Sequence, residues 1–403
     1  MEVYVARQPI FNRSKRIYGY ELLFRGGSAN AFPPIDGDTA TSKLLSSSFF
    51  NVGIEQLTGG RKAFVNFTEE LLVKRIPVLF PKDVLVVEIL ENVNPHNGVV
   101  EACREIAKQG YLVALDDFFY NTEWDALISL ANIIKIDFLA TPIETIKAYV
   151  QKLARPGLKF LAEKVETYEE FQTALDLGFE FFQGYFFSKP QMVEGKDISP
   201  SKINLLQLVA EANRPDFRFE ELEKIVSRDV SISYKLMRYI NSPFFKRVHE
   251  ISSIKQAVVL LGEEGMKRFI SLIVMAKLAS DKPEELVRTS IIRARLCELL
   301  GKYAQTQIDG SELFTLGLFS LIDAIMDQKM ETVMQKLPLA EPIKKALTSG
   351  EGRLADYLKV ATSYEAGDWE GFARSTQRLG IEQERVPKLY LEALGWADSM
   401  NNV

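Results

Sequence analysis

Cysteine is scarce in this 403-residue chain, in which Cys103 and Cys297 are the only two and lie one in each half. Two isolated cysteines make neither a disulfide framework nor the paired spacing of a metal site, so we expect both to be small buried residues in a reducing cytosol. A signal-peptide pattern is missing from the amino terminus, and the most apolar later stretch, 269–276, is far shorter than the roughly 20 residues that cross a membrane. The sequence therefore predicts a cytoplasmic protein with no membrane partner.

An excess of positive charge is also missing. Lysine and arginine number 49 against 54 aspartates and glutamates, which gives a net charge of -5. Proteins that bind nucleic acid polymers usually carry a basic surplus, so we expect no such partner. The length is too great for one typical core and suits two domains.

The first half of the chain alternates strand-like and helix-like segments. Eight apolar runs have strand length, at 3–9, 17–24, 63–67, 84–90, 111–118, 133–136, 159–165 and 179–185. Helix-like stretches separate most of them, as at 39–52, 97–109, 123–131, 143–153 and 168–177. This alternation predicts a mostly parallel sheet, and eight strands predict closure into a TIM-like barrel. The segment is short for that fold, so we expect trimmed crossover helices, and the short link 11–16 predicts an antiparallel first pair.

The pattern changes after residue 190. The stretch 192–201 is polar and is typical of a linker, and no convincing strand follows it. Helical periodicity prevails instead, as at 203–212, 219–227, 231–241, 265–278, 284–303, 311–326, 357–364 and 385–397. We therefore expect a fold of class α/β plus all-α, with a trimmed barrel domain at 1–195 and an all-helical domain at 196–403.

Polar residues recur near the carboxyl ends of the expected strands. They are Glu21, Arg25, Asn66, Glu88, Glu91, Asp116, Asp117, Lys135, Asp137, Glu163, Glu166 and Gln183. One acidic residue after a strand is usually a helix cap or a solvated loop residue, but recurrence at seven of eight strand ends favours a site at one mouth of a parallel barrel.

Convergence of these carboxylates would cause strong repulsion in a pocket of low dielectric, which divalent cations relieve. Hard oxygen ligands, including the amide of Asn66, suit Mg²⁺ or Mn²⁺. A paired-metal carboxylate site is a common device for phosphodiester hydrolysis. In such a site Lys135 would orient or activate water and Arg25 would bind a phosphate.

Eight short motifs follow one another along the first 190 residues. They are Arg7-Gln8-Pro9-Ile10, Tyr20-Glu21-Leu22-Leu23-Phe24-Arg25, Phe64-Val65-Asn66-Phe67, Val87-Glu88-Ile89-Leu90-Glu91, Leu115-Asp116-Asp117-Phe118, Ile134-Lys135-Ile136-Asp137, Ala162-Glu163-Lys164-Val165-Glu166-Thr167 and Gln183-Gly184-Tyr185-Phe186-Phe187-Ser188-Lys189-Pro190. Together they resemble the EAL family of cyclic-di-GMP phosphodiesterases, with Leu22 where the family signature has alanine.

The resemblance implies a role for each matching residue. Metal ligands for Mg²⁺ or Mn²⁺ would be Glu21, Asn66, Glu88, Asp116 and, for a second ion, Asp117. Lys135 and Glu163 would be catalytic and would position or activate water. Substrate contacts would come from Arg25, Gln183 and Gln8, while Glu91 would support the loop after Asp117. The implied reaction opens cyclic-di-GMP to linear pGpG.

Three departures from the family pattern bear on activity. The segment 118–123 has no glycine where the family loop is rich in glycine and serine, which changes the backbone conformations open to it. Lys164 stands in place of a glycine, where its ammonium could replace part of a metal's charge or point to solvent. Asn132 replaces an aspartate, which would remove a ligand. Weak or conditional hydrolysis is one expectation, and a catalytically inactive receptor or interaction scaffold is the alternative. A barrel enzyme acting on another phosphoester is a third reading.

The second half resembles the HDOD domain, a helical relative of metal-dependent HD phosphohydrolases. The segments that carry the resemblance are 230–242, 251–258 and 260–262. An HD metal site needs several histidines, and the chain has only His96 and His249. We therefore expect a non-catalytic relay domain that contacts an unknown signalling protein, with a homodimer among the open oligomeric states.

Overall fold

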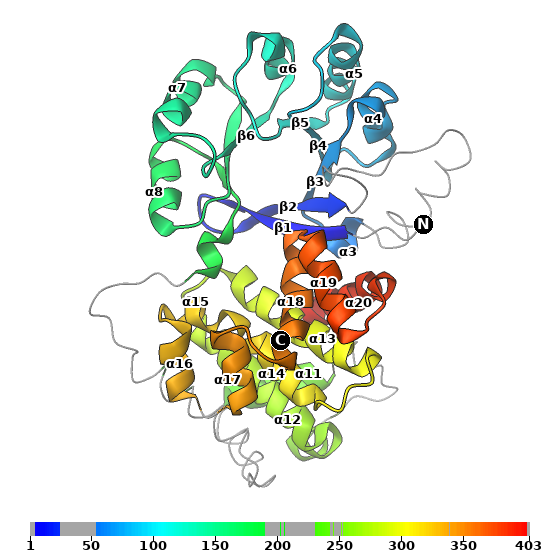
Figure 1. Cartoon of the computed structure of the whole chain (residues 1–403), viewed down its shortest axis with the longest axis vertical. Helices are drawn as coiled ribbons and strands as arrows, with labels where there is room; N and C mark the ends of the chain where they lie inside the picture. The colour runs from blue at the N-terminus through cyan, green and yellow to red at the C-terminus, as the bar shows by residue number, and fades with distance from the viewer. Residues whose placement is uncertain are drawn as a thin grey trace. The chain divides into compact units, whose positions relative to one another are not determined.

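The computed structural model describes residues 5–24, 54–189, 202, 205, 230–241, 245, 251, 253–337 and 339–400. The chain divides into two compact units (Figure 1). The first comprises Met1–Phe187 and Ser363–Trp369, and the second comprises Ser188–Thr362 and Glu370–Val403. The domain boundary expected near residue 195 lies outside the described residues, as does the helix expected at 39–52.

Eight strands of the first unit close into a barrel in sequence order. They are β1 (Val5–Asn12), β2 (Ile17–Phe24), β3 (Lys62–Phe67), β4 (Leu85–Ile89), β5 (Leu112–Leu115), β6 (Ile133–Asp137), β7 (Lys159–Glu163) and β8 (Phe181–Phe182). Strand β1 is antiparallel to both of its neighbours, and every pair from β2 to β8 is parallel. The predicted TIM-like barrel with an antiparallel first pair is confirmed.

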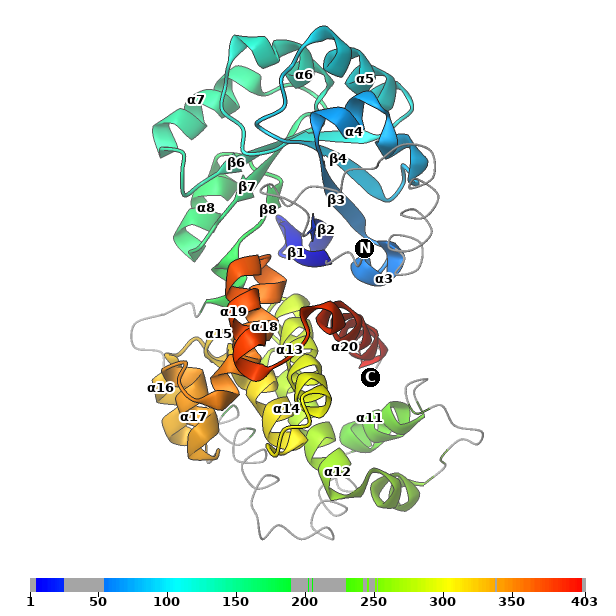
Figure 2. The ribbon, with the colours of Figure 1, turned by 45° about the vertical axis from the view of Figure 1, so that its right-hand side comes forward.

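Helices cover the outside of the barrel (Figure 2). They are α3 (Ile54–Thr58), α4 (Glu69–Val73), η2 (Ile76–Leu79), α5 (Asn97–Lys108), η3 (Thr122–Trp124), α6 (Asp125–Leu130), α7 (Ile143–Leu153), α8 (Tyr168–Asp176) and η4 (Tyr185–Ser188). The helices α3 and α4 have five residues each and α6 has six, which agrees with the expected trimming of the crossovers.

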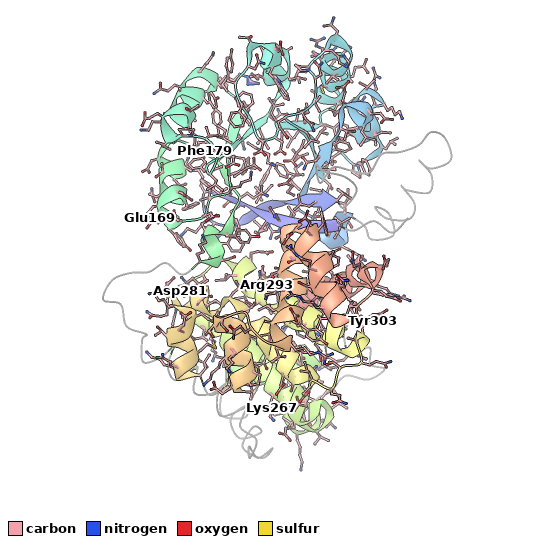
Figure 3. All side chains as sticks on the ribbon, viewed as in Figure 1. Glu169, Phe179, Lys267, Asp281, Arg293 and Tyr303 are labelled. Atoms are coloured by element: carbon pink, nitrogen blue, oxygen red, sulfur yellow. The ribbon has the colours of Figure 1, made fainter. Side chains whose placement is uncertain are left out.

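An apolar layer fills the barrel interior at mid-height. It consists of Ile10, Phe64, Val86, Ala114, Ile133, Leu161 and Phe181, with Tyr18 and Leu112 packed against it. Side chains occupy the space that the strands enclose (Figure 3), so the barrel is a packed core and not a pore. Because side chains alternate between the two faces of a strand, a residue two positions from each layer member also points inward, one layer away.

Every secondary-structure element within the described residues of the second unit is a helix. Its elements are α11 (Val230–Ile240), α12 (Ile254–Leu278), α13 (Glu284–Tyr303), α14 (Gly310–Leu318), η6 (Phe319–Leu321), α15 (Ile322–Met326), α16 (Met330–Lys336), α17 (Glu341–Thr348), α18 (Arg353–Ala366), α19 (Trp369–Leu379), η7 (Gln383–Arg385) and α20 (Val386–Met400). Helix α13 buries Ile292, Leu296 and Leu300 in the core. The helices α18 and α19 flank Gly367, and the segment between residues 363 and 369 belongs to the barrel unit.

Both cysteines are free and buried, as the sequence predicts. Burial raises the pKa of the Cys103 thiol to about 12, so it remains a neutral core residue. Among the described residues, no helix has both the length and the apolar character needed to cross a bilayer.

Candidate active site

A polar layer lies directly above the apolar layer and follows from strand periodicity. Two positions beyond Phe64, Val86, Ala114, Ile133, Leu161 and Phe181 come Asn66, Glu88, Asp116, Lys135, Glu163 and Gln183. On the antiparallel first strand the step runs backwards, from Ile10 to Gln8, and Gln8 pairs with Glu21 across the β1–β2 ladder. The strand ends that the sequence singles out therefore converge at one mouth.

Lys135 lies at the centre of this layer. Its ammonium nitrogen is 2.6 Å from Asp116 Oδ1, 2.8 Å from Glu88 Oε1, 2.9 Å from Glu163 Oε1 and 3.4 Å from Glu21 Oε2. The Lys135 side chain has no exposed surface. One positive charge thus faces four carboxyl groups in a setting of low dielectric.

Burial governs the ionisation of these groups. It raises the pKa of Glu88 and of Glu163 well above the ordinary value, and neighbouring carboxylates add to the rise against the pull of Lys135. Burial likewise raises the pKa of Asp116 to about 6. Burial also holds back the ionisation of Glu21, but the Lys135 charge and hydrogen bonds from Gln183 and Asn66 outweigh it and lower that pKa. One ammonium therefore does not fully offset the cost of burying four carboxylates.

The raised pKa of Lys135 is the counterpart of this effect. Burial alone would lower the pKa, but the charges of the four carboxylates outweigh it and raise the value well above 10.5. Lys135 is therefore a permanent cation in the folded barrel.

Amide side chains orient the Glu21 carboxylate. It accepts hydrogen bonds from Asn66 Nδ2 at 3.1 Å and from Gln183 Nε2 at 2.7 Å. Gln183 Nε2 also donates to Gln8 Oε1 at 3.0 Å, and Gln8 Nε2 donates to the Ala366 carbonyl at 3.2 Å. Gln8, which the resemblance assigns to substrate, thus holds the Gln183 amide, and Ala366 belongs to the same unit.

The donor set fits a divalent metal ion. Five buried side-chain oxygens of the layer and its rim accept no hydrogen bond: Asn66 Oδ1, Glu88 Oε2, Asp117 Oδ1, Glu163 Oε2 and Gln183 Oε1. Hard oxygen atoms of this kind are the ligands that Mg²⁺ and Mn²⁺ prefer. Within the described residues, no three acidic, histidine or cysteine side chains already form a metal cage, because the Lys135 ammonium lies between the carboxylates.

Comparison with known proteins decides the family. The EAL domain model matches residues 1–190, and the HDOD domain model matches residues 200–348. The cyclic di-GMP phosphodiesterase CdgJ of Vibrio cholerae is 38% identical over 403 residues, which cover 99% of this chain and 93% of that protein. The chain belongs to the EAL–HDOD family. The uncharacterized protein YuxH of Bacillus subtilis is 36% identical over 408 residues, which cover 99% of this chain and 99% of that protein.

Solved structures resemble the EAL half more distantly. A calcium and cyclic-di-GMP complex of BlrP1 from Klebsiella pneumoniae is 21% identical, covers 47% of this chain and 56% of that chain, and has a TM-score of 0.37. A likeness of this size supports no argument about the site.

A second lysine lies at the rim of the EAL barrel. Lys164 follows Glu163, and its ammonium contacts Asp137 Oδ2 and lies 3.7 Å from Asp117 Oδ1. Burial opposes its charge, but the hydrogen bond to Asp137 and the charges of nearby acidic groups raise its pKa. The sequence motif contains Asp137 but gives it no role. The sequence does offer one indication of its position: Asp137 follows Lys135 by two residues on β6, so both side chains point into the barrel.

Glu91 and Asn132 are not part of this cluster. Arg25 lies outside the described residues. Glu91 is exposed in the turn after β4. Asn132 precedes β6 and its Oδ1 accepts from the Val113 amide at 2.9 Å, which places it at the opposite end of the barrel. The expectation that Asn132 removes a metal ligand is therefore wrong, because its side chain is engaged far from the mouth.

The glycine-free segment 118–123 of the EAL domain is well anchored. The Phe118 side chain is buried, and its amide donates to the Lys135 carbonyl at 3.1 Å. Asn121 Oδ1 accepts from the Glu123 amide and begins η3. The strained residue is Asp117 just before it, with φ of 39°.

Proposed function

We propose that the EAL barrel binds cyclic-di-GMP and hydrolyses it to linear pGpG with a divalent metal ion, Mg²⁺ or Mn²⁺. The observation that carries the proposal is the set of buried oxygens without hydrogen-bond donors around an acidic cluster that one lysine cannot neutralise. The name of the relative CdgJ, a cyclic-di-GMP phosphodiesterase, supports the substrate class.

The residues of the layer divide the work. Glu21, Asn66, Glu88 and Asp116 would hold a metal ion, and Asp117 would be the ligand of any second ion. When bound, such an ion activates water and neutralises the charge that develops on phosphate. Glu163, which contacts the Lys135 ammonium at 2.9 Å, is assigned to positioning the attacking water. Lys135 keeps the surrounding carboxylates in place, and we assign it to positioning the attacking water through them.

Substrate contacts are assigned at the rim. We assign Gln183 and Arg25 to the nucleotide, with Gln8 acting on Gln183 through the hydrogen bond between the two amides. Glu91 would support the segment after Asp117 from its exposed turn. The HDOD half is proposed as a non-catalytic relay to a signalling protein, and a homodimer is one arrangement in which it would act.

A second candidate function is a receptor that binds cyclic-di-GMP without turnover. The observation that favours it is that Lys135 and Lys164 already neutralise part of the acidic set without a metal ion. A barrel of this kind would keep its nucleotide contacts and transmit binding to a protein partner.

The test is incubation of the full chain with cyclic-di-GMP and Mg²⁺ or Mn²⁺, with linear product and bound nucleotide followed together. We expect metal-dependent product from the parent, at least about a hundredfold less from Glu21→Ala, since metal ligands are essential to such sites, and no change in Glu169→Ala. Glu169 is an exposed residue of α8 on the outer surface of the barrel (Figure 3), so its replacement removes the same charge as Glu21→Ala but at a distance from the mouth.

Other outcomes select among the alternatives. Nucleotide binding without product in the parent would establish the receptor, and neither binding nor product would leave a scaffold. Undiminished product in a folded Glu21→Ala variant would refute the site assignment.

A further inference from the structure

Two lysines with different surroundings serve the acidic mouth of the barrel. Lys135 is enclosed by Glu21, Glu88, Asp116 and Glu163. Lys164 instead reaches Asp117 and Asp137, neither of which contacts Lys135 among the ion pairs of the described residues. The acidic set is thus split into an inner group around one ammonium and an outer pair around another.

The outer pair is built to face a cation. Asp137 is buried, and its Oδ1 accepts from the amides of Leu139 at 2.7 Å and Ala140 at 2.9 Å. These two bonds fix the carboxylate, so that its Oδ2 points to Lys164. Asp117 Oδ1 is buried and accepts no hydrogen bond, and Lys164 at 3.7 Å is the cation nearest to it among the described ion pairs.

The backbone holds these partners in strained conformations. Asp117 has φ of 39° and Lys164 has φ of 51°, in the left-handed region that side chains with a Cβ rarely adopt. Each follows directly on a residue of the inner group, Asp116 and Glu163. Strain of this kind persists where the surroundings enforce it, and it clusters at functional sites. Here it turns the Lys164 ammonium toward the two carboxylates.

We propose that Lys164 takes the place of a second divalent cation between Asp117 and Asp137, so that the barrel binds a single divalent ion, at the inner group. A divalent ion could reach the outer pair only by displacing the ammonium or by lying against its charge, and both weaken binding. The Lys164 side chain is half exposed, so solvent reaches its methylene groups, while its ammonium lies between Asp117 and Asp137. This inference rests on the proposed metal dependence and specifies its stoichiometry.

The experiment measures Mn²⁺ bound per full chain without nucleotide, by equilibrium dialysis and by electron paramagnetic resonance. The variants are Lys164→Gly, which removes the ammonium and the strain, and Lys164→Asn, which is neutral and also tolerates a left-handed backbone. The matched control is Lys15→Gly in the β1–β2 turn, since Lys15 has φ of 56° and the same charge but lies outside the acidic mouth.

We expect one tightly bound Mn²⁺ in the parent and in Lys15→Gly. Both neutral Lys164 variants should bind a second Mn²⁺ at least about tenfold more tightly than the parent does, the effect of removing one nearby charge, with spin–spin broadening between the two ions. Two equally tight ions in the parent, or one ion in both Lys164 variants, would overturn the inference and leave the metal-dependent function standing. No bound Mn²⁺ in any folded variant would overturn both.

Discussion

Replacement of Lys135 by methionine tests whether its ammonium stabilises the four carboxylates at the barrel mouth. Methionine has a similar length and an apolar stem, so it fills the space of the lysine and removes only the ammonium. The change leaves four buried carboxyl groups without their shared cation. Their oxygens lie 2.6 to 3.4 Å from the Lys135 nitrogen. The fold has to respond either by protonating them or by loosening the mouth.

The size of the loss follows from these distances. At an effective dielectric of about 20, each pair is worth roughly 5 to 6 kcal/mol before desolvation. The full sum is not lost, because the pKa values of Glu88 and Glu163 are already raised by burial and these groups can take up protons. Removal of one partner from a buried ion pair typically costs about 3–5 kcal/mol. We expect a loss of this size for Lys135→Met at pH 7.5, a large part of the stability of a typical domain.

The assay is denaturant and thermal unfolding of the metal-free full chain, with Lys147→Met as the control. Lys147 is half exposed on α7 and forms one surface ion pair with Glu144, so its loss should cost less than about 1 kcal/mol. The deficit of Lys135→Met should shrink at pH 5, where the carboxyls accept protons. Equal unfolding midpoints for the two variants at pH 7.5 would refute the view that the carboxylates depend on Lys135.

Two further predictions concern pH and backbone. Folding raises the pKa of Asp116 from 3.8 to about 6, so the folded barrel holds this proton more tightly than the unfolded chain does. The stability that this proton contributes is fully present below pH 4, and about 3 kcal/mol is lost as pH rises from 4 through 6. Mg²⁺ should therefore raise the melting temperature more at pH 7.5 than at pH 5, and an equal or larger rise at pH 5 would contradict this. Gly184→Ala should lower the free energy of unfolding by more than about 1 kcal/mol, measured by denaturant unfolding. The reason is that Gly184 has φ of 148° and an added Cβ would lie 2.1 Å from the Val165 carbonyl oxygen. Gly178→Ala is the control, with φ of 90° in open space, and an equal loss in both would show that only conformation matters.

Strand periodicity made most of the polar layer predictable. Asn66, Glu88 and Glu163 each lie near the end of an apolar run, and parallel strands bring such ends to one mouth. The hairpin-sized link between the first two strands likewise fixed their antiparallel pairing. These inferences succeeded because they depend only on the local alternation of side chains and on the length of a connection.

Other features depend on contacts that no local pattern contains. Gln8 orients Gln183 and is itself held by Ala366, which is 358 residues away in the chain. Nothing near Gln8 in the sequence indicates this partner. The left-handed backbone of Lys164 is equally hidden, since lysine has no preference for that region. Asn132 illustrates a further limit. It lies only three residues before Lys135 in the sequence, but it precedes β6 and bonds to the Val113 amide, so it is at the end of the barrel away from the mouth.

The placement of the two lysines bears on how enzyme and receptor could share this fold. Lys135 is built into the middle of a strand and stabilises the inner carboxylates whether or not a metal ion is bound. Stability is therefore separated from catalysis, because a barrel that stops binding metal still has a cation at its centre. Lys164 lies on a strained, half-exposed turn, where a single substitution changes the charge of the outer pair without altering the core. Under the proposed function, a substitution of Lys164 would thus change the number of bound ions while Lys135 and the inner carboxylates stayed in place.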